Sequence, residues 1–171
     1  VEAVDVLKSR ATSLIITVDN GISAIEEIKH AKEIGIDVVV TDHHRVGDEL
    51  PDAVAVVDPH REDSFCEFSD WAGVGVAFKL VCALENGEDY DVLEKYGDLV
   101  TVGTIADIVS LKGENRIIVR SGIAIINASF QDGTLRKGLA SLFEISGNNG
   151  VIDSASVAYR IAPRINAAGR M

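Results

Sequence analysis

The chain has 171 residues, of which 47% are hydrophobic and 25% charged, which is sufficient for a globular domain with its own core. The formal net charge of −11 argues against a broad electrostatic surface for nucleic acid, although metal ions can neutralise phosphate locally. No apolar run approaches the roughly 18 residues of a membrane span, and no signal peptide is visible. Two cysteines outside any Cys-x-x-Cys pair favour a reduced, cytoplasmic protein.

In the first sixty residues, predicted helices and strands follow one another in the order typical of a parallel α/β sheet. A short helix is expected from Val1 to about Arg10, and an amphipathic helix from Gly21 to about Glu33, with Gly35 after it as a C-cap. Near-continuous apolar runs, which are typical of buried parallel strands, predict strands at residues 14–18, 36–41 and 53–57. The sequence therefore predicts an α/β fold that begins with a parallel sheet.

The remainder of the chain is expected to be mostly helical. After a polar loop at residues 61–71, helices are predicted at residues 75–85, 92–108, 114–128, 135–143 and 154–161. Pro163 is expected to break the last helix and to leave Arg164 and Asn166 on an irregular segment. Without a long linker, one domain is predicted, with an α/β part over about residues 1–60 and a helical part over about residues 72–171.

Polar side chains follow two of the predicted strands. Asp42, His43 and His44 come directly after one strand, and Asp19 comes directly after the strand before it. Neighbouring strands lie about 4.8 Å apart, so Asp19 and His43 are expected within reach of one ion. The alternative is a polar strand end whose histidines cap a helix or bond to each other, but the matching position of Asp19 favours a divalent metal site and hydrolytic chemistry.

Two other groups of residues carry candidate chemistry. Asp107 is a single acid in an apolar helical stretch. Either it caps a helix end or faces solvent, or it points at a cation. Arg164, Asn166 and Arg170 belong to an arginine-rich string at the end of this acidic chain. Guanidinium groups suit phosphate oxygens, which makes these three residues candidate phosphate contacts; otherwise the arginines pair with local acids.

A glycine-rich run, Gly73-Val74-Gly75-Val76-Ala77, precedes the first helix of the second half. The preferred interpretation is a closely packed helix start, with phosphate binding as the alternative. Trp71 and Phe78 are expected in the core rather than as platforms for stacked bases.

Four segments together resemble the DHH phosphoesterase superfamily. They are Val18-Asp19-Asn20-Gly21, Thr41-Asp42-His43-His44, residues 103–111 and residues 162–171. The last two resemble more specifically the RecJ branch, a family of single-strand-specific 5′ to 3′ DNA exonucleases. The resemblance implies that residues 1–171 form a partial DHH domain, and that the family's upstream Asp-x-Asp motif and C-terminal substrate-binding domain lie outside it.

The resemblance also implies roles for the residues that match. Asp19 would bridge metal ions, and His43 and Asp107 would be further ligands of one ion. His44 and Asp42 would be the catalytic pair, with His44 on the scissile phosphate and Asp42 in support. The cofactor would be Mn²⁺ or Mg²⁺, and two ions about 3.5–4 Å apart would serve the complete enzyme.

Partners are implied in the same way. Single-stranded DNA would be the substrate in DNA repair and recombination, with a single-strand-binding protein and a helicase as partners. The isolated 171-residue chain is expected to be inactive, and either to self-associate or to cover residues 14–18 with its own N-terminal residues. No membrane partner is expected. Two alternatives stay open: a DHH enzyme for small phosphates such as pyrophosphate, nano-RNA or cyclic dinucleotides, and a non-catalytic DHH-like scaffold.

Overall fold

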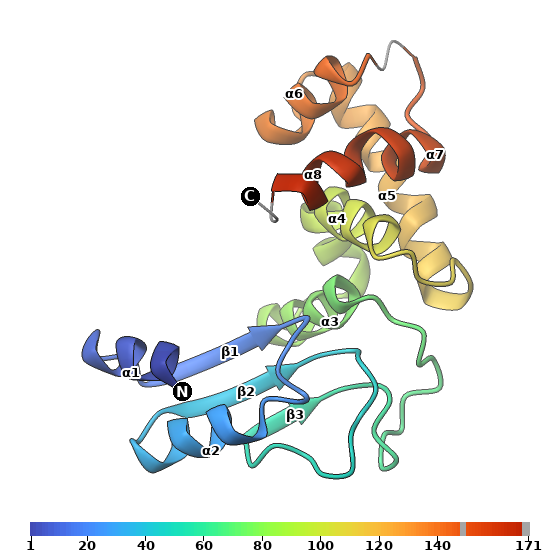
Figure 1. Cartoon of the computed structure of the whole chain (residues 1–171). Coiled ribbons are helices and arrows are strands. Elements are labelled where there is room, and N and C mark those ends of the chain that lie inside the picture. The colour runs from blue at the N-terminus through green and yellow to red at the C-terminus, as the bar shows by residue number, and fades with distance from the viewer. Residues whose placement is uncertain (148–149, 169–171) are drawn as a thin grey trace. The chain divides into compact units, whose positions relative to one another are not determined.

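The computed structural model describes residues 1–147 and 150–168 and confirms the α/β class (Figure 1). The chain divides into two compact units, Val1–Ala77 and Phe78–Met171. Within the described ranges, no helix combines the length and apolar character needed to cross a membrane.

The first unit is built on a three-stranded parallel sheet in the order β1-β2-β3. The strands are β1 (Leu14–Val18), β2 (Asp37–Thr41) and β3 (Ala55–Val57). The helices of this unit are α1 (Glu2–Ser9) and α2 (Ile25–Glu33), which precede β1 and β2. Val18 pairs with Thr41, so β1 and β2 end at the same level, and the residues after them emerge side by side.

One face of the sheet packs against the two helices. Val38 and Val40, two residues apart on β2, point to the same face and are buried with Ile28 and Ala31 of α2 and Val4 of α1. One face of β2 is therefore buried under the helices, and the pairing of β1 with β2 brings the ends of the two strands to the same level.

The other face of β1 is apolar and open. Leu14, Ile16 and Val18 are 48%, 47% and 51% exposed, and β1 forms one edge of the sheet among the described residues. An apolar edge strand offers main-chain N–H and C=O groups to another chain.

We expect the 171-residue chain to self-associate through β1, because pairing would cover these side chains and satisfy the edge. Light scattering over a concentration range should show the mass rising, and Ile16→Lys should reduce the rise. A wild-type chain that stays monomeric throughout the range would contradict this expectation.

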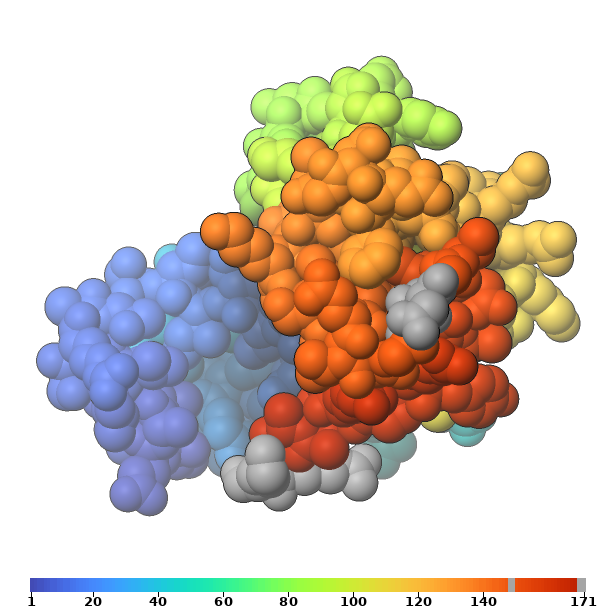
Figure 2. All heavy atoms as spheres, turned by 90° about the horizontal axis from the view of Figure 1, so that it is seen from above, coloured from blue at the N-terminus to red at the C-terminus, as the bar shows by residue number. Residues whose placement is uncertain are grey.

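The second unit consists of helices. They are α3 (Gly73–Glu85), which starts in the first unit, α4 (Asp89–Ala106), α5 (Gly113–Gln131), α6 (Lys137–Ile145), α7 (Ser154–Ser156), the π-helical turn η1 (Val157–Ile161) and α8 (Ala162–Ala168). Its core is centred on the fully buried Ile126, Phe143, Ile152, Val157 and Ile161. Figure 2 shows α6 (orange) beside the η1–α8 run (red), and α6 contacts η1.

Two of the predicted element boundaries are wrong for physical reasons. The helix expected from Gly21 begins at Ile25, because Gly21 has φ +114° and residues 21–24 form a turn. Pro163 does not end the helical run: Arg164 and Asn166 lie on α8. The π turn η1 comes first, with the Ala162 N–H bonded to the Val157 carbonyl, and Pro163 follows near the start of α8, where a missing N–H is tolerated.

Candidate metal centre

Asp19 is held in an unusual backbone conformation at the end of β1. Its φ is +60°, and its N–H donates to the Thr41 carbonyl oxygen at 3.0 Å. The left-handed region costs an ordinary L-residue about 1–2 kcal/mol, although aspartate tolerates it better than most. This conformation directs a half-exposed carboxylate over the strand ends, where strained residues often serve function.

Gly73 makes room for that carboxylate. A β-carbon on Gly73 would lie 2.2 Å from Asp19 Oδ1 and 2.5 Å from its Cγ. Gly75 is equally crowded, because its β-carbon would meet Trp71 Cε3 at 2.5 Å. The glycine-rich run is thus a closely packed helix start, as preferred from the sequence, and Trp71 and Phe78 are both buried core residues. The glycine at position 73 also lets the Asp19 carboxylate sit at the first residue of α3.

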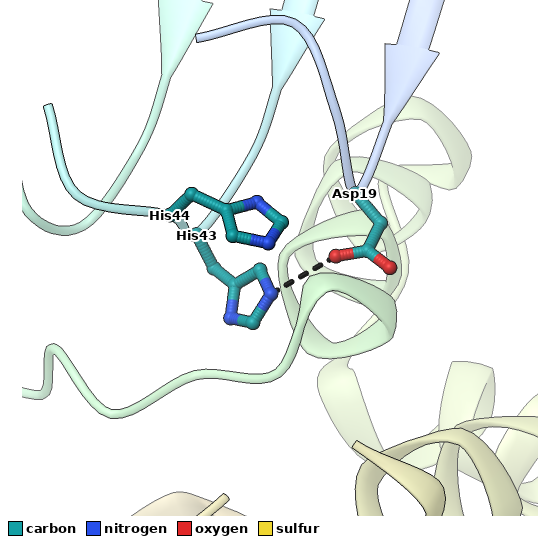
Figure 3. A group of neighbouring side chains, drawn as sticks. All are labelled: Asp19, His43 and His44. Atoms are coloured by element: carbon teal, nitrogen blue, oxygen red, sulfur yellow. Dashed lines mark ion pairs between the residues drawn. The ribbon is translucent and has the colours of Figure 1, made fainter. Parts of the chain in front are cut away.

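The tautomer of His43 follows from its partner. Its Nδ1 lies 2.9 Å from the Trp71 carbonyl oxygen, which can only accept, so Nδ1 carries the proton. In the neutral ring Nε2 then presents a lone pair, and it lies 2.9 Å from Asp19 Oδ1 (Figure 3). Two acceptors at this separation require a cation, either a proton on Nε2 or a metal ion between them.

The donor set fits a metal ion. Asp19, His43 and His44 each offer a ligand atom, and these atoms lie within 4.8 Å of one another. Neighbouring ligands of an octahedral ion at about 2.1 Å lie about 3.0 Å apart, which matches the separation of Asp19 and His43. A carbonyl behind the ligating imidazole is the usual outer support of such a ligand. The residues present therefore suit a divalent cation such as Mn²⁺.

Asp42 lies beneath the two histidines rather than among the ligands. Its carboxylate is 1% exposed and accepts hydrogen bonds from the backbone N–H groups of Ile22 at 2.9 Å, His43 at 2.8 Å and His44 at 3.2 Å. It also accepts from His44 Nδ1 at 2.6 Å. Burial alone would raise the pKa of Asp42, but these hydrogen bonds outweigh it and hold the pKa below its ordinary value.

His44 is consequently oriented with one nitrogen inward and the other outward. Its Nδ1 is bonded to Asp42, its side chain is 60% exposed, and its ring centroid lies 4.6 Å from that of His43. Nε2 is the atom that can meet a substrate oxygen. Asp42 therefore holds the orientation of the His44 ring.

Asp58 is a third strand-end acid, and it was not among the predicted site residues. It follows β3 as Asp19 and Asp42 follow β1 and β2, and that repetition is the sequence signal that could have found it. Its side chain is fully buried and accepts from the His60 N–H at 2.8 Å. Burial raises the pKa of Asp58, and the nearby charge of Asp42 raises it further, while His60 and His43 oppose the rise.

Asp58→Asn is expected to stabilise the fold at neutral pH. The raised pKa means that the ionised form is disfavoured in the folded state, so stability falls as pH rises from about 3.8 through the folded-state pKa. Asparagine keeps the oxygen that faces His60 and removes the charge. The free energy of unfolding should rise by about 1.4 kcal/mol for every pKa unit by which folding raises the pKa of Asp58. Thermal melts should show a higher Tm at pH 7 and no difference below pH 3.8. A variant that melts lower at pH 7 would contradict this account.

Asp107 lies in the second unit, at the C-cap of α4. Its N–H donates to the Gly103 carbonyl oxygen at 3.0 Å and its side chain is exposed. The last turn of α4 carries no basic residue. A carboxylate is unfavourable at the negative end of a helix dipole, which makes a cation a suitable neighbour. Its convergence with Asp19 and His43 stays a prediction.

The candidate phosphate contacts lie at the end of the second unit. Arg164 and Asn166 are exposed on α8, and Arg170 lies outside the described residues. Arg164 Nη1 donates to the Arg160 carbonyl one turn earlier, and Arg160 Nη1 donates to the Gly147 carbonyl at 3.1 Å. Over residues 1–147 and 150–168, no ion pair joins Arg164 to a carboxylate, which weighs against the alternative that it serves to neutralise local acids.

A parallel sheet whose strand ends present a carboxylate and two imidazoles describes an α/β protein with a candidate metal centre. The sequence model for the DHH family, N-terminal domain, matches residues 2–104, and the chain belongs to this family.

Within the family, the chain is similar to RecJ proteins. It is 47% identical to the single-stranded-DNA-specific exonuclease RecJ of Bacillus subtilis, over 96% of this chain and 20% of that protein. It is 42% identical to the RecJ of Thermus thermophilus, over 94% of this chain and 23% of that protein.

Solved structures agree with these matches. A crystal structure of exonuclease RecJ bound to manganese superposes with a TM-score of 0.80 at 39% identity, covering 99% of this chain and 41% of the other. The structure of Thermus thermophilus RecJ in complex with Mn²⁺ superposes with a TM-score of 0.79 at 38% identity, covering 99% and 24%. The chain thus spans less than half the length of the relatives it matches.

Proposed function

We propose that the protein carrying this chain is a metal-dependent, single-strand-specific DNA exonuclease of the RecJ type. The observation that carries the proposal is the Asp19–His43–His44 cluster, placed at the strand ends of a chain that matches RecJ proteins along nearly its whole length. An enzyme for small phosphates is not favoured, because the relatives described above are exonucleases. A non-catalytic scaffold would have no use for a donor set suited to a cation.

The roles of the side chains follow from their partners. Asp19 and His43 would hold a Mn²⁺ or Mg²⁺ ion, with Asp107 as a further ligand, and such ions lower the pKa of bound water and neutralise phosphate charge. Because the Trp71 carbonyl accepts from His43 Nδ1, Nε2 is the nitrogen that would bind the ion. Asp42 holds His44 so that Nε2 faces outward, where its protonated form would donate to a phosphate or leaving oxygen.

Further elements of the proposal concern the whole protein. Two ions would act together, with part of their ligand set outside this chain. A single-strand-binding protein and a helicase would supply and present the substrate, and the site of action would be the cytoplasm. The 171-residue chain is proposed to lack turnover by itself.

The direct test is an assay of the full-length protein on 5′-phosphorylated single-stranded DNA with Mn²⁺. Duplex DNA, pyrophosphate and cyclic dinucleotides serve as competing substrates. Preferred degradation of the single strand supports the proposal, whereas preferred hydrolysis of the small phosphates would replace it with the alternative.

Arg164→Ala is expected to weaken binding of single-stranded DNA by the full-length protein. A charge-assisted hydrogen bond contributes roughly 1.5–3 kcal/mol, and removing a phosphate contact also makes the affinity less dependent on salt. Fluorescence anisotropy at several salt concentrations measures both effects. If neither the affinity nor its salt dependence changes, Arg164 does not contact phosphate, and its role is limited to the hydrogen bond that it donates to the Arg160 carbonyl.

A further inference from the structure

An apolar pocket of about 580 Å³ opens beside Asp107 in the second unit. The two chain neighbours of Asp107, Ala106 and Ile108, both line it, and the η1–α8 run supplies Tyr159, Pro163 and Asn166. Pockets of this size with mostly apolar walls and few polar groups are typical of small-ligand sites. No role assigned above to Asp107 or Arg164 uses this pocket.

Ile108 is the strained part of this wall. It has φ +59°, a region that β-branched residues rarely adopt, and it is 90% exposed. A glycine or asparagine usually occupies such a position after a helix, since either avoids the strain. Ile108 is thus a large apolar side chain that is held in a strained conformation and exposed to solvent. Strained residues of this kind are often found where a side chain contacts a ligand.

The lining of the same pocket also includes an aromatic ring and a polar side chain. Tyr159 is 81% exposed on η1, and Asn166, one of the candidate phosphate contacts, lines the same pocket. An exposed aromatic side chain offers a face on which any base can stack, and a carboxamide both donates and accepts at a base edge. Arg160 and Arg164 do not line the pocket, but they follow Tyr159 and Pro163 of its lining directly in the sequence, which brings two positive charges close to it along the helical run.

We propose that this pocket binds a nucleobase of the single-stranded DNA, between Ile108 and Tyr159, while the arginines beside it hold the backbone. The inference rests on the proposed function and assigns a base subsite to it. Since stacking is tolerant of base identity, the subsite would hold single strands of any sequence. A paired base is stacked within its duplex and cannot enter the pocket, so the subsite also favours single strands.

The test compares two ligands in the full-length protein, with a chelator present so that nothing is cleaved. One is oligothymidylate and the other is an abasic oligomer with the same number of phosphates. Tyr159→Ala should weaken binding of oligothymidylate by about fivefold to a hundredfold, the range expected for one stacked base, and leave binding of the abasic oligomer unchanged. Tyr159→Phe should retain wild-type affinity.

Two further variants separate binding from folding. Ile108→Gly relieves the strained φ and is expected to raise the melting temperature while it weakens oligothymidylate binding selectively. Tyr90→Ala is the matched control, because Tyr90 is a 69% exposed tyrosine on α4 that does not line this pocket, and it should change neither affinity.

Equal effects of Tyr159→Ala on the two oligomers, or none on either, would overturn the base subsite while leaving the exonuclease proposal intact. A full-length protein that also fails to degrade single-stranded DNA with Mn²⁺ in the assay described above would overturn both.

Discussion

Asp19→Ala and His43→Ala should each reduce Mn²⁺-dependent hydrolysis by the full-length protein at least about a hundredfold. Loss of an outer-shell partner alone typically reduces metal affinity or activity by about 10- to 100-fold, and these two residues are the proposed ligands themselves. Calorimetric titration with Mn²⁺ should show a parallel loss of affinity. Gly73→Ala should weaken Mn²⁺ binding without removing a ligand, because its β-carbon would displace the Asp19 carboxylate.

A matched control lies elsewhere in the first unit. His30 Nε2 and Asp5 Oδ1 form another histidine–aspartate pair at 2.6 Å, between α2 and α1. His30→Ala should leave both Mn²⁺ affinity and hydrolysis unchanged. If Asp19→Ala behaves like His30→Ala, Asp19 is not a metal ligand.

Asp42→Ala is expected to destabilise the fold by about 3–5 kcal/mol. Three backbone N–H groups, of Ile22, His43 and His44, lose their acceptor, and each unsatisfied buried donor costs about 1–3 kcal/mol, less where it is partly solvated. Against a usual total of about 5–15 kcal/mol, this is a large fraction. Urea denaturation measures it directly.

The loss of stability in Asp42→Ala is also expected to depend on pH. The lowered pKa of Asp42 means that its contribution is present above the unfolded value of about 3.8 and is lost as pH falls through the folded-state pKa. The difference in unfolding free energy between wild type and Asp42→Ala should therefore narrow in acid. Asp48→Ala, in the exposed loop after the histidines, should stay within about 0.5 kcal/mol of wild type at every pH. A difference of equal size in acid would show that the carboxylate charge is not what stabilises the turn.

The strands were predictable because each is an apolar run with a polar residue at its end. Strand β1 matches its expected range, and β2 and β3 begin one and two residues later than expected. The start of α2 was misplaced because periodicity cannot reveal that Gly21 adopts a positive φ. The effect of Pro163 was misjudged because a π turn depends on packing around Val157 and Ile161, both fully buried.

In the candidate site, the closeness of Asp19 and His43 was predictable, whereas the groups that hold them in place were less so. Two strand ends in register were sufficient to bring Asp19 and His43 together. The Trp71 carbonyl that fixes the His43 tautomer is a main-chain atom 28 residues away, which no residue pattern encodes. Asp58 could have been found from its strand-end position, but its burial depends on the folded loop after β3.

The π turn η1 also sets the rotational phase of everything that follows it. Its Val157-to-Ala162 bond spans one residue more than an α-helical turn would, and each residue adds about 100° of rotation around a helix axis. Arg164 and Asn166 therefore face a different direction from the one a regular helix would give them. A deletion of one residue between positions 157 and 161 would change that direction more than any single substitution, so spacing in this segment, rather than residue identity alone, governs what α8 presents.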